Sequence, residues 1–363
     1  MPVALLTNVL AGYRIPLYRR LAERCDVEVL CFGAGARYVP SWFSDLEAQI
    51  AAAPFPARAI ASPREAFAAG RSHSAVIAPV AGGTMLPAAY SGARRAGVPF
   101  VLWASIWARP RTRRNDLAWP LVRRIHRRAD AVVAYGEHVR RFVRSIRGRD
   151  DDVLVAPQCV ETDLFGREVA RAEVAALRER HGLGDGPLVL YAGRLVPEKG
   201  VEVLLDAWRG ARRPAATLVL AGEGPLAAPA GGTPGARVLG PLPRKDLAAL
   251  YAASAAVAVP SLTTPAFLEP WGLVCNEAML QARPVVATPA VGAVAGGLVR
   301  HGETGLVVPE RRPDALADAL AGLLAAPAER KRLGAAGRDA ARALTYDGAA
   351  DAFASALRVA GAR

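Results

Sequence analysis

The sequence predicts an α/β protein made of two doubly wound domains, each with a parallel sheet. Short, continuous apolar runs alternate with helix-length amphipathic stretches, and six such units occur in each half of the chain. Strands that are apolar throughout, rather than at every second residue, indicate sheets covered by helices on both faces. The length of 363 residues also suits two domains of roughly 150 residues each.

The apolar runs give the expected strands in order. Six lie in the first half, over residues 3–10, 27–32, 75–80, 99–104, 131–135 and 153–156. Six lie in the second half, over residues 187–192, 216–221, 237–239, 255–259, 284–287 and 305–308. Doubly wound folds bind ligands beyond the carboxyl ends of their strands, so the loops after these runs are the first place to look for a site.

The domain boundary is expected after Phe165. Residues 166–186 begin polar, form a charged helix and reach a glycine-rich turn before the next strand. We therefore predict one domain over residues 1–165 and a second over residues 166–345. The last segment, 346–363, has helical apolar spacing and could pack on either domain.

Composition excludes several classes of protein. A hydrophobic share of 52% and a charged share of 22% are those of a globular chain, not a disordered one. The four cysteines form no Cys-x-x-Cys pair, which favours buried thiols in a reducing compartment over a disulfide framework. The start of the chain has no charged leader, and no apolar run has the length of a membrane span, so a cytoplasmic protein is expected, at most peripheral to a membrane.

The first candidate binding loop is Gly193-Arg194-Leu195-Val196-Pro197-Glu198-Lys199-Gly200. It follows an expected strand and precedes an expected helix, so backbone N–H groups and a helix N-terminus would face a ligand there. Arg194 and Lys199 add two cations, which suit a diphosphate better than a single carboxylate. The alternative is an ordinary strand-to-helix turn with solvated charges.

The second candidate is Glu269-Pro270-Trp271-Gly272-Leu273-Val274-Cys275-Asn276-Glu277-Ala278. Glu269 stands before a glycine-bearing turn and Glu277 about one turn into the following helix. Both carboxylates could face a ligand at the helix N-terminus, although acidic residues are also common there as complements of the helix dipole. Further glycine-bearing loops occur at Gly222–Pro225, directly after an expected strand, and later at His301–Gly305.

Together these motifs resemble glycosyltransferase family 4. The strings GRLVPEKG, GEGP, EPWGLVCNEAM and HGETGLVVP occur in that order, and the likeness is detailed over residues 153–309 and looser before them. The resemblance implies the GT-B architecture, in which two Rossmann-like domains enclose the active site. It also implies transfer of a hexose-type sugar from a nucleotide-diphosphate sugar to an acceptor hydroxyl, with the anomeric configuration retained.

The resemblance assigns roles to particular residues. Arg194 and Lys199 would clamp the donor diphosphate, Glu269 would lie beside the donor sugar and Glu277 would accept hydrogen bonds from the ribose. The backbone of Gly272, Leu273 and Val274 would face the sugar and phosphate. The catalytic set is then Arg194, Lys199 and Glu269, and no metal or other cofactor is expected. The acidic run 150–152 is interpreted as a surface loop, not as a metal site.

In the first domain the resemblance implies a phosphate contact and an acceptor site. Gly12 would let the backbone approach the donor phosphate from the opposite side, and Tyr13, Arg14, Trp103 and Ser105 are candidates for acceptor binding. Many family members carry a histidine in the loop after the fourth strand, but here that loop has Ser105 and no histidine. Trp103 could equally be a core residue.

The charge distribution leaves the acceptor open. The net charge is +13, and residues 109–149 hold 13 arginines against three acidic residues. This stretch could dock on an anionic membrane, attract a soluble anionic acceptor or form a solvated helix face. Nucleic-acid binding fits the charge but no recognition motif supports it.

Several functions therefore compete. The favoured one is a retaining glycosyltransferase of cell-envelope polysaccharide or glycolipid assembly, using a UDP- or GDP-sugar. An enzyme that tailors a small natural product, such as an antibiotic, is nearly as well supported. An NAD-dependent oxidoreductase would need a Gly-x-Gly-x-x-Gly loop after the first strand of a domain, which is missing, and a non-catalytic sugar-nucleotide binding protein is the remaining alternative.

Overall fold

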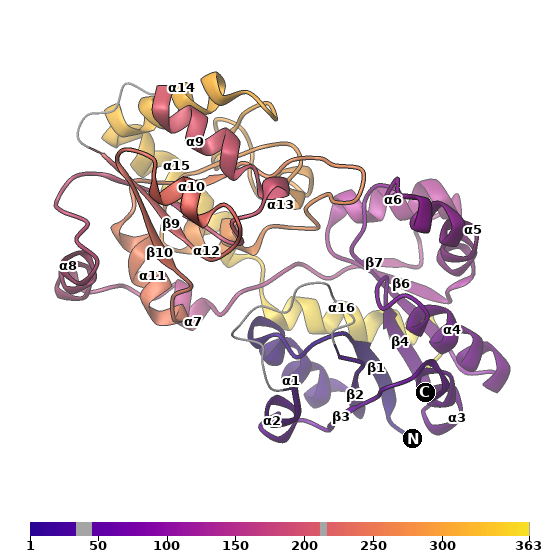
Figure 1. Cartoon of the computed structure of the whole chain (residues 1–363). Helices are drawn as coiled ribbons and strands as arrows, with labels where there is room; N and C mark the ends of the chain where they lie inside the picture. Colours follow the sequence, from indigo (N-terminus) through magenta and orange to yellow (C-terminus); the bar gives the residue numbers. More distant parts are fainter. Residues whose placement is uncertain (34–45, 211–215, 363) are drawn as a thin grey trace. The chain divides into compact units, whose positions relative to one another are not determined.

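The computed structural model describes residues 1–33, 46–210 and 216–362, and these form two compact units (Figure 1). Unit 1 contains Met1–Cys159 and Thr345–Arg363, and unit 2 contains Val160–Leu344. Both units are parallel sheets with helices on their faces, which shows the predicted α/β, doubly wound class. Among the described residues, no helix combines the length and apolarity needed to span a bilayer.

The sheet of unit 1 has the strand order β3-β2-β1-β4-β5-β6-β7, with every described pairing parallel. Its strands are β1 Val3–Thr7, β2 Val27–Cys31, β3 Ala57–Ala59, β4 Ala75–Pro79, β5 Phe100–Ala104, β6 Ala131–Ala134 and β7 Val153–Val155. All residues of β1, β5 and β6 are buried, as expected for strands covered on both faces. The strand order reverses between β1 and β4, so the switch point of unit 1 lies beyond their carboxyl ends.

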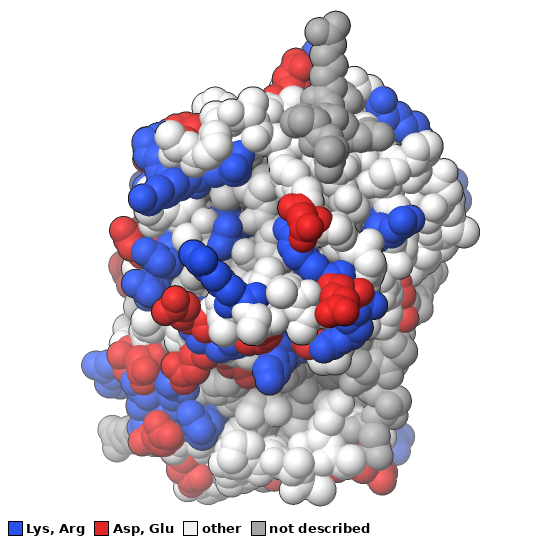
Figure 2. Space-filling model, turned by 90° about the vertical axis from the view of Figure 1, so that its left-hand side faces the viewer, with Lys and Arg blue, Asp and Glu red and all other residues white. Residues whose placement is uncertain are grey.

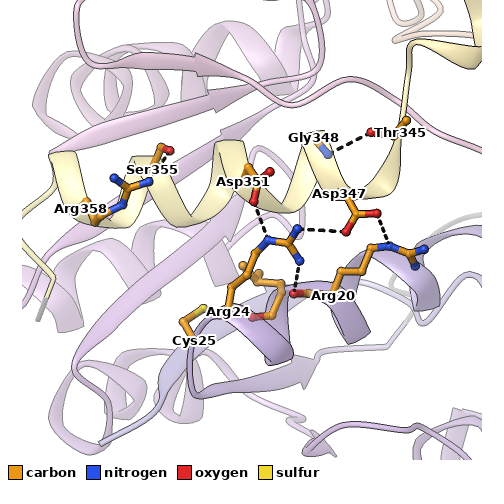
Figure 3. A network of polar contacts seen from close by, with 10 residues as sticks. Arg20, Arg24, Cys25, Thr345, Asp347, Gly348, Asp351, Ser355 and Arg358 are labelled. Carbon is orange, nitrogen blue, oxygen red and sulfur yellow. Dashed lines mark hydrogen bonds and ion pairs between the residues drawn. The ribbon is translucent and has the colours of Figure 1, made fainter.

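The helices of unit 1 include the C-terminal helix of the chain, which follows unit 2 in the sequence but packs in unit 1. They are η1 Gly12–Arg14, α1 Ile15–Arg24, α2 Leu46–Ala51, α3 Pro63–Ser72, α4 Met85–Ala96, α5 Arg113–Arg128, α6 Glu137–Arg147 and α16 Tyr346–Val359. α16 packs beside α1 and buries Phe353 against the ring of Trp103 at a centroid distance of 5.2 Å (Figure 1). An ion-pair network on the surface joins the same two helices (Figure 3): Arg24 binds Asp351 at 2.6 Å and Asp347 at 3.0 Å.

The sheet of unit 2 has the order β10-β9-β8-β11-β12-β13, again parallel. Its strands are β8 Leu188–Ala192, β9 Thr217–Ala221, β10 Ala236–Gly240, β11 Ala256–Val259, β12 Val285–Ala287 and β13 Leu306–Val307. Its helices are α7 Thr162–Phe165, α8 Arg171–Arg180, η3 Pro197–Lys199, α9 Val201–Gly210, α10 Ala227–Gly231, α11 Arg244–Ala253, α12 Leu273–Leu280, α13 Gly292–Ala295, α14 Pro313–Ala325 and α15 Pro327–Arg342. The switch point of unit 2 lies between β8 and β11.

Two details of the sequence expectation differ from the structure. The domain boundary lies at Cys159, before the short helix α7, because Val160 and Phe165 are buried in the core of unit 2. The edge strand β3 was not predicted, because it has only three residues, is partly exposed and carries Arg58 at its centre. The sequence left open which domain the last segment packs on, and in the structure its helix α16 packs on unit 1.

Two expectations about single residues are also corrected. Asp152 is buried rather than exposed in a surface loop, because it pairs with Arg147 and, at 2.7 Å, with Arg149. All four cysteines are free thiols, but Cys25 is partly exposed, whereas Cys31, Cys159 and Cys275 are buried.

Candidate active site

The loops that follow β8 and β11 touch at the switch point of unit 2. Gly200 closes the first loop with a φ of +71°, and a Cβ added there would lie 1.9 Å from the carbonyl oxygen of Pro260. Only glycine permits both this backbone conformation and this close approach. The candidate residues of the two loops are therefore brought together where doubly wound sheets bind ligands.

Lys199 and Glu269 form an ion pair across these two loops. The hydroxyl of Ser261, which follows β11, donates a hydrogen bond to Oε2 of Glu269 over 3.1 Å. Glu269 is 7% exposed and Ser261 is buried, and the Lys199 ammonium lies 5.4 Å from the ring centroid of Phe267. A carboxylate so little exposed needs partners for its charge, and Lys199 and Ser261 supply them.

Arg194 lies in the same loop as Lys199 and is partly exposed. Its guanidinium lies 3.6 Å from the Glu198 carboxylate, and its backbone carbonyl accepts a 2.6 Å hydrogen bond from the buried hydroxyl of Tyr191. Burial raises the pKa of Tyr191 well above its usual range, so this phenol is neutral and acts as a donor. Tyr191 thus fixes the loop that carries both cations.

Glu277 lies on α12 and receives a hydrogen bond from a buried tyrosine. The Tyr251 hydroxyl donates to Oε2 of Glu277 over 2.8 Å. Burial raises the pKa of Glu277, and the hydrogen bond from Tyr251 opposes that rise. A carboxylate with one oxygen held by a phenol has acceptor capacity left on the other oxygen for a ligand hydroxyl.

The N-terminus of α12 is formed by Gly272 in a left-handed conformation, with φ 93° and ψ 70°. A Cβ at this position would lie 2.9 Å from Cγ1 of Val291, so a side chain would be both strained and crowded. Leu273 and Val274 are the first residues of the helix, where backbone N–H groups have no acceptor within the helix. This end of α12 follows Glu269 in the chain and adds anion-binding capacity to the same loop.

The predicted residues of unit 1 lie along the carboxyl edge of its sheet. Gly12, Tyr13 and Arg14 form η1 after β1, Trp103 is in β5 and Ser105 follows it. Trp103 is 1% exposed and the guanidinium of Arg14 lies over its ring at 4.6 Å, so a sugar could stack on this ring only if Arg14 moved. Gly12 is exposed, whereas Tyr13, Arg14 and Ser105 are partly exposed.

Sequence reasoning missed the tyrosines that hold the site. Tyr191 lies in a strand and Tyr251 in a helix, and both segments have the sequence of ordinary core elements. In the folded chain the Tyr191 hydroxyl donates to the backbone carbonyl of Arg194, and the Tyr251 hydroxyl donates to the carboxylate of Glu277. No local pattern signals such contacts. Ser261 lies in the loop that follows β11, and a position after a parallel strand is the one sequence signal that could have suggested a role for it. Within the described part of the chain, no three His, Cys, Asp or Glu residues gather into a metal site.

Two doubly wound units with parallel sheets are the architecture of the GT-B class, and one of them holds the Lys199–Glu269 ion pair at its switch point. The fold matches the crystal structure of HepE from Anabaena in complex with UDP and glucose, with a TM-score of 0.80 over 99% of both chains and 19% identity. Residues 174–340 match the family of glycosyl transferases group 1.

Curated relatives extend this similarity beyond unit 2. A GDP-mannose-dependent alpha-(1-6)-phosphatidylinositol monomannoside mannosyltransferase of Mycolicibacterium smegmatis is 33% identical over 277 residues, which cover 70% of this chain and 69% of that protein. Its counterpart in Mycobacterium tuberculosis is 34% identical over 247 residues, and the match spans 63% of each protein. An alpha-D-kanosaminyltransferase of Streptomyces kanamyceticus is 35% identical over 181 residues, 47% of this chain and 45% of that protein. The chain belongs to the group 1 glycosyl transferases, the family 4 enzymes with the GT-B fold that its motifs resemble.

Proposed function

We propose that this protein is a retaining glycosyltransferase that moves a hexose-type sugar from a nucleotide-diphosphate sugar to an acceptor hydroxyl, without a metal. The observation that carries the proposal is the Lys199–Glu269 pair at the switch point of unit 2, with Arg194 in the same loop. Membership of the group 1 glycosyl transferases supports the same reaction class.

The two cations fit the charge that develops in such a transfer. The nucleoside diphosphate gains negative charge as its bond to the sugar breaks, so cations placed beforehand stabilise the transition state more than the ground state. Lys199 is held in place by Glu269, and the loop carrying Arg194 is held by Tyr191. In this proposal Arg194 and Lys199 supply the positive charge that a divalent cation supplies in other enzymes.

The surroundings of Glu269 favour attack from the front face of the sugar. A double displacement needs a carboxylate nucleophile close to the anomeric carbon. Oε2 of Glu269 already accepts a hydrogen bond from Ser261 and pairs with Lys199, and both contacts lower its nucleophilicity. The leaving phosphate would then take the proton of the acceptor, and the protein would position the reactants.

The named relatives favour assembly of a cell-envelope glycolipid. The mycobacterial proteins are named for GDP-mannose and for a phosphatidylinositol mannoside. GDP-mannose is therefore the first donor to test here, followed by UDP-sugars. The chain would act in the cytoplasm, peripheral to the inner face of the membrane.

The exposed face of α5 supports contact with an anionic membrane. Leu117 is 86% exposed and Leu121 is 46% exposed, and the two lie one helical turn apart. None of the six arginines of α5 forms an ion pair with a residue that the structure describes, in contrast to α8, where Arg180 pairs with Asp246 at 2.9 Å. On the α8 side of the molecule, shown in Figure 2, basic and acidic side chains are intermixed.

Apolar side chains flanked by unpaired arginines are typical of a helix that lies in a membrane interface. The carboxyl ends of α5, α6 and α16 also form a hollow of about 950 Å³ that is lined by six arginines and the exposed Val359.

Sedimentation with vesicles of phosphatidylcholine, with and without phosphatidylglycerol, tests whether α5 contacts an anionic membrane. Binding that needs the anionic lipid and falls in Leu117→Ser/Leu121→Ser supports it, and equal binding by that variant contradicts it.

A second candidate is the glycosylation of a small natural product. It is favoured by the kanosaminyltransferase, which matches 47% of this chain at 35% identity. Release of nucleoside diphosphate from GDP-mannose and UDP-sugars, measured with glycolipid acceptors and with small natural products as acceptors, separates the two candidate functions. Turnover with neither acceptor class and no hydrolysis of any donor would overturn the enzymatic proposal in favour of a binding protein.

A further inference from the structure

Arg14 is a cation without an acidic partner at the carboxyl edge of the sheet of unit 1. It ends η1, directly after β1, at the switch point of this sheet. Its Nη2 donates a 2.6 Å hydrogen bond to the hydroxyl of Tyr135, which follows β6. The side chain therefore reaches from the end of β1, past β4 and β5, to the end of β6.

Aromatic rings hold this guanidinium in one place. Its central carbon lies 4.6 Å from the ring centroid of Trp103 and 5.5 Å from that of Tyr13. Tyr135 and Trp103 also pack against each other at 5.7 Å. A flat guanidinium stacked on a buried indole and tied to a phenol is ordered before any ligand arrives, so little side-chain entropy is lost when it binds one.

The charge of Arg14 has no counter-ion within the described part of the chain. No carboxylate there forms an ion pair with it, and its buried Nε has no hydrogen-bond partner there. Burial raises the pKa of Tyr135 to about 12 and also raises the pKa of Tyr18, so these phenols are neutral at physiological pH. By contrast, Arg20 and Arg24 on the adjacent α1 both pair with acidic residues of α16 (Figure 3).

A partly buried arginine is costly to keep without an anion, and it is used where phosphates are recognised. We propose that Arg14 is the phosphoryl-binding residue of unit 1, and that the ligand it takes at the switch point carries a phosphate group. The inference rests on the proposed function, since a glycosyltransferase offers two sources of this group. One is the diphosphate of the donor, and the other is a phosphate on the acceptor.

Isothermal titration of the full chain distinguishes these sources. The variants are Arg14→Gln, Arg14→Lys and the control Arg19→Gln, which removes an exposed charge from the same region. Each is titrated with GDP and UDP, and then with inorganic phosphate both alone and with saturating nucleotide. If the donor is the source, Arg14→Gln weakens nucleotide binding about tenfold or more, and Arg19→Gln does not.

If the acceptor is the source, Arg14→Gln leaves nucleotide affinity unchanged but abolishes binding of phosphate to the nucleotide-saturated protein. Arg14→Lys retains part of the affinity in either case, because it keeps the charge but not the planar fork. Arg14→Lys also tests the inference if Arg14→Gln fails to fold. Phosphate and nucleotide affinities that are the same in wild type and both Arg14 variants overturn the inference. Failure of the wild type to bind any nucleotide would instead overturn the proposed function. In that case the role of Arg14 would still be tested by comparing the phosphate affinity of the wild type with that of the Arg14 variants in the absence of nucleotide.

Discussion

Lys199 and Glu269 are 70 residues apart in the chain and form an ion pair at the switch point of unit 2. One comes from the loop after β8 and the other from the loop after β11, so the pair exists only when these neighbouring strands are in register. Glu269 thereby fixes the position of the Lys199 ammonium. A cation fixed before the donor binds contributes to catalysis without reorganising during the reaction.

Ser261 is expected to act as a positioning residue for Glu269. Ser261→Ala removes the 3.1 Å hydrogen bond to the carboxylate, and we expect kcat to fall about tenfold with little change in KM for the donor. The matched control is Ser254→Ala, because Ser254 is equally buried but donates to the carbonyl oxygen of Leu250. Steady-state kinetics of both variants check this. Equal losses of kcat in the two variants would mean that Ser261 has only a structural effect.

Glu277 predicts a pH dependence of donor binding. Burial raises its pKa, so on acidification Glu277 takes up its proton at a higher pH than an ordinary glutamate. In its proposed role it would then accept the ribose hydroxyls less well. Affinity for intact GDP-mannose or UDP-glucose should therefore weaken as the pH falls from neutral towards about 5. Intact sugar nucleotides are used because their diphosphate does not titrate in this range.

Two variants test the assignment of that pH dependence. In Glu277→Gln the affinity should be about tenfold lower at neutral pH and should no longer change with pH. In Tyr251→Phe the ionised carboxylate loses a hydrogen bond, so the transition should move to higher pH. A transition that stays unchanged in both variants would show that another group titrates.

The surface network between α1 and α16 predicts a pH-dependent contribution to stability. Hydrogen bonds from Arg24 and Arg20 lower the pKa of Asp347 (Figure 3). Such a group stabilises the fold at pH values above its pKa in the unfolded chain, and this stability is lost as the pH falls through the lower pKa of the folded state. Asp347→Asn should therefore lower the Tm at neutral pH, and its difference from wild type should shrink below about pH 4.

The control for this network is Asp318→Asn on α14, since Asp318 is exposed and pairs with no residue that the structure describes. Thermal unfolding across the pH range checks both variants. A Tm difference for Asp347→Asn that persists in acid would mean that the charge of Asp347 is not its cause.

The sequence predicts the strands of this fold far better than the contacts within its site. In the part of the chain that the structure describes, twelve strands coincide with the predicted apolar runs. The strand β3 was missed because Ala57–Ala59 is short, partly exposed and interrupted by an arginine. The motifs located Arg194, Lys199, Glu269 and Glu277, because loops after parallel strands meet at one edge of a sheet. They gave no information on Tyr251, whose contact with Glu277 depends on how α11 packs against α12.

The sequence also did not predict whether particular aromatic and charged side chains are buried or exposed. Trp103 is the penultimate residue of β5, where the sequence allowed either core packing or contact with an acceptor. Its burial beneath Arg14 depends on α16, near the C-terminus. Asp152 was predicted to lie in a surface loop because its acidic run follows an arginine-rich helix, but Arg147 of that helix, α6, forms a buried ion pair with it.

The most direct test of the central claim is the titration of the protein with GDP and UDP in the presence of EDTA. Wild type should bind one of these nucleotides without a metal, and Arg194→Ala/Lys199→Ala should lose about 100-fold or more in affinity. The charge-matched control Arg237→Ala/Lys331→Ala, at two exposed positions of unit 2, should bind as wild type does. Unchanged affinity in the Arg194/Lys199 variant, or loss of wild-type binding in EDTA, would contradict a metal-independent diphosphate clamp at this switch point.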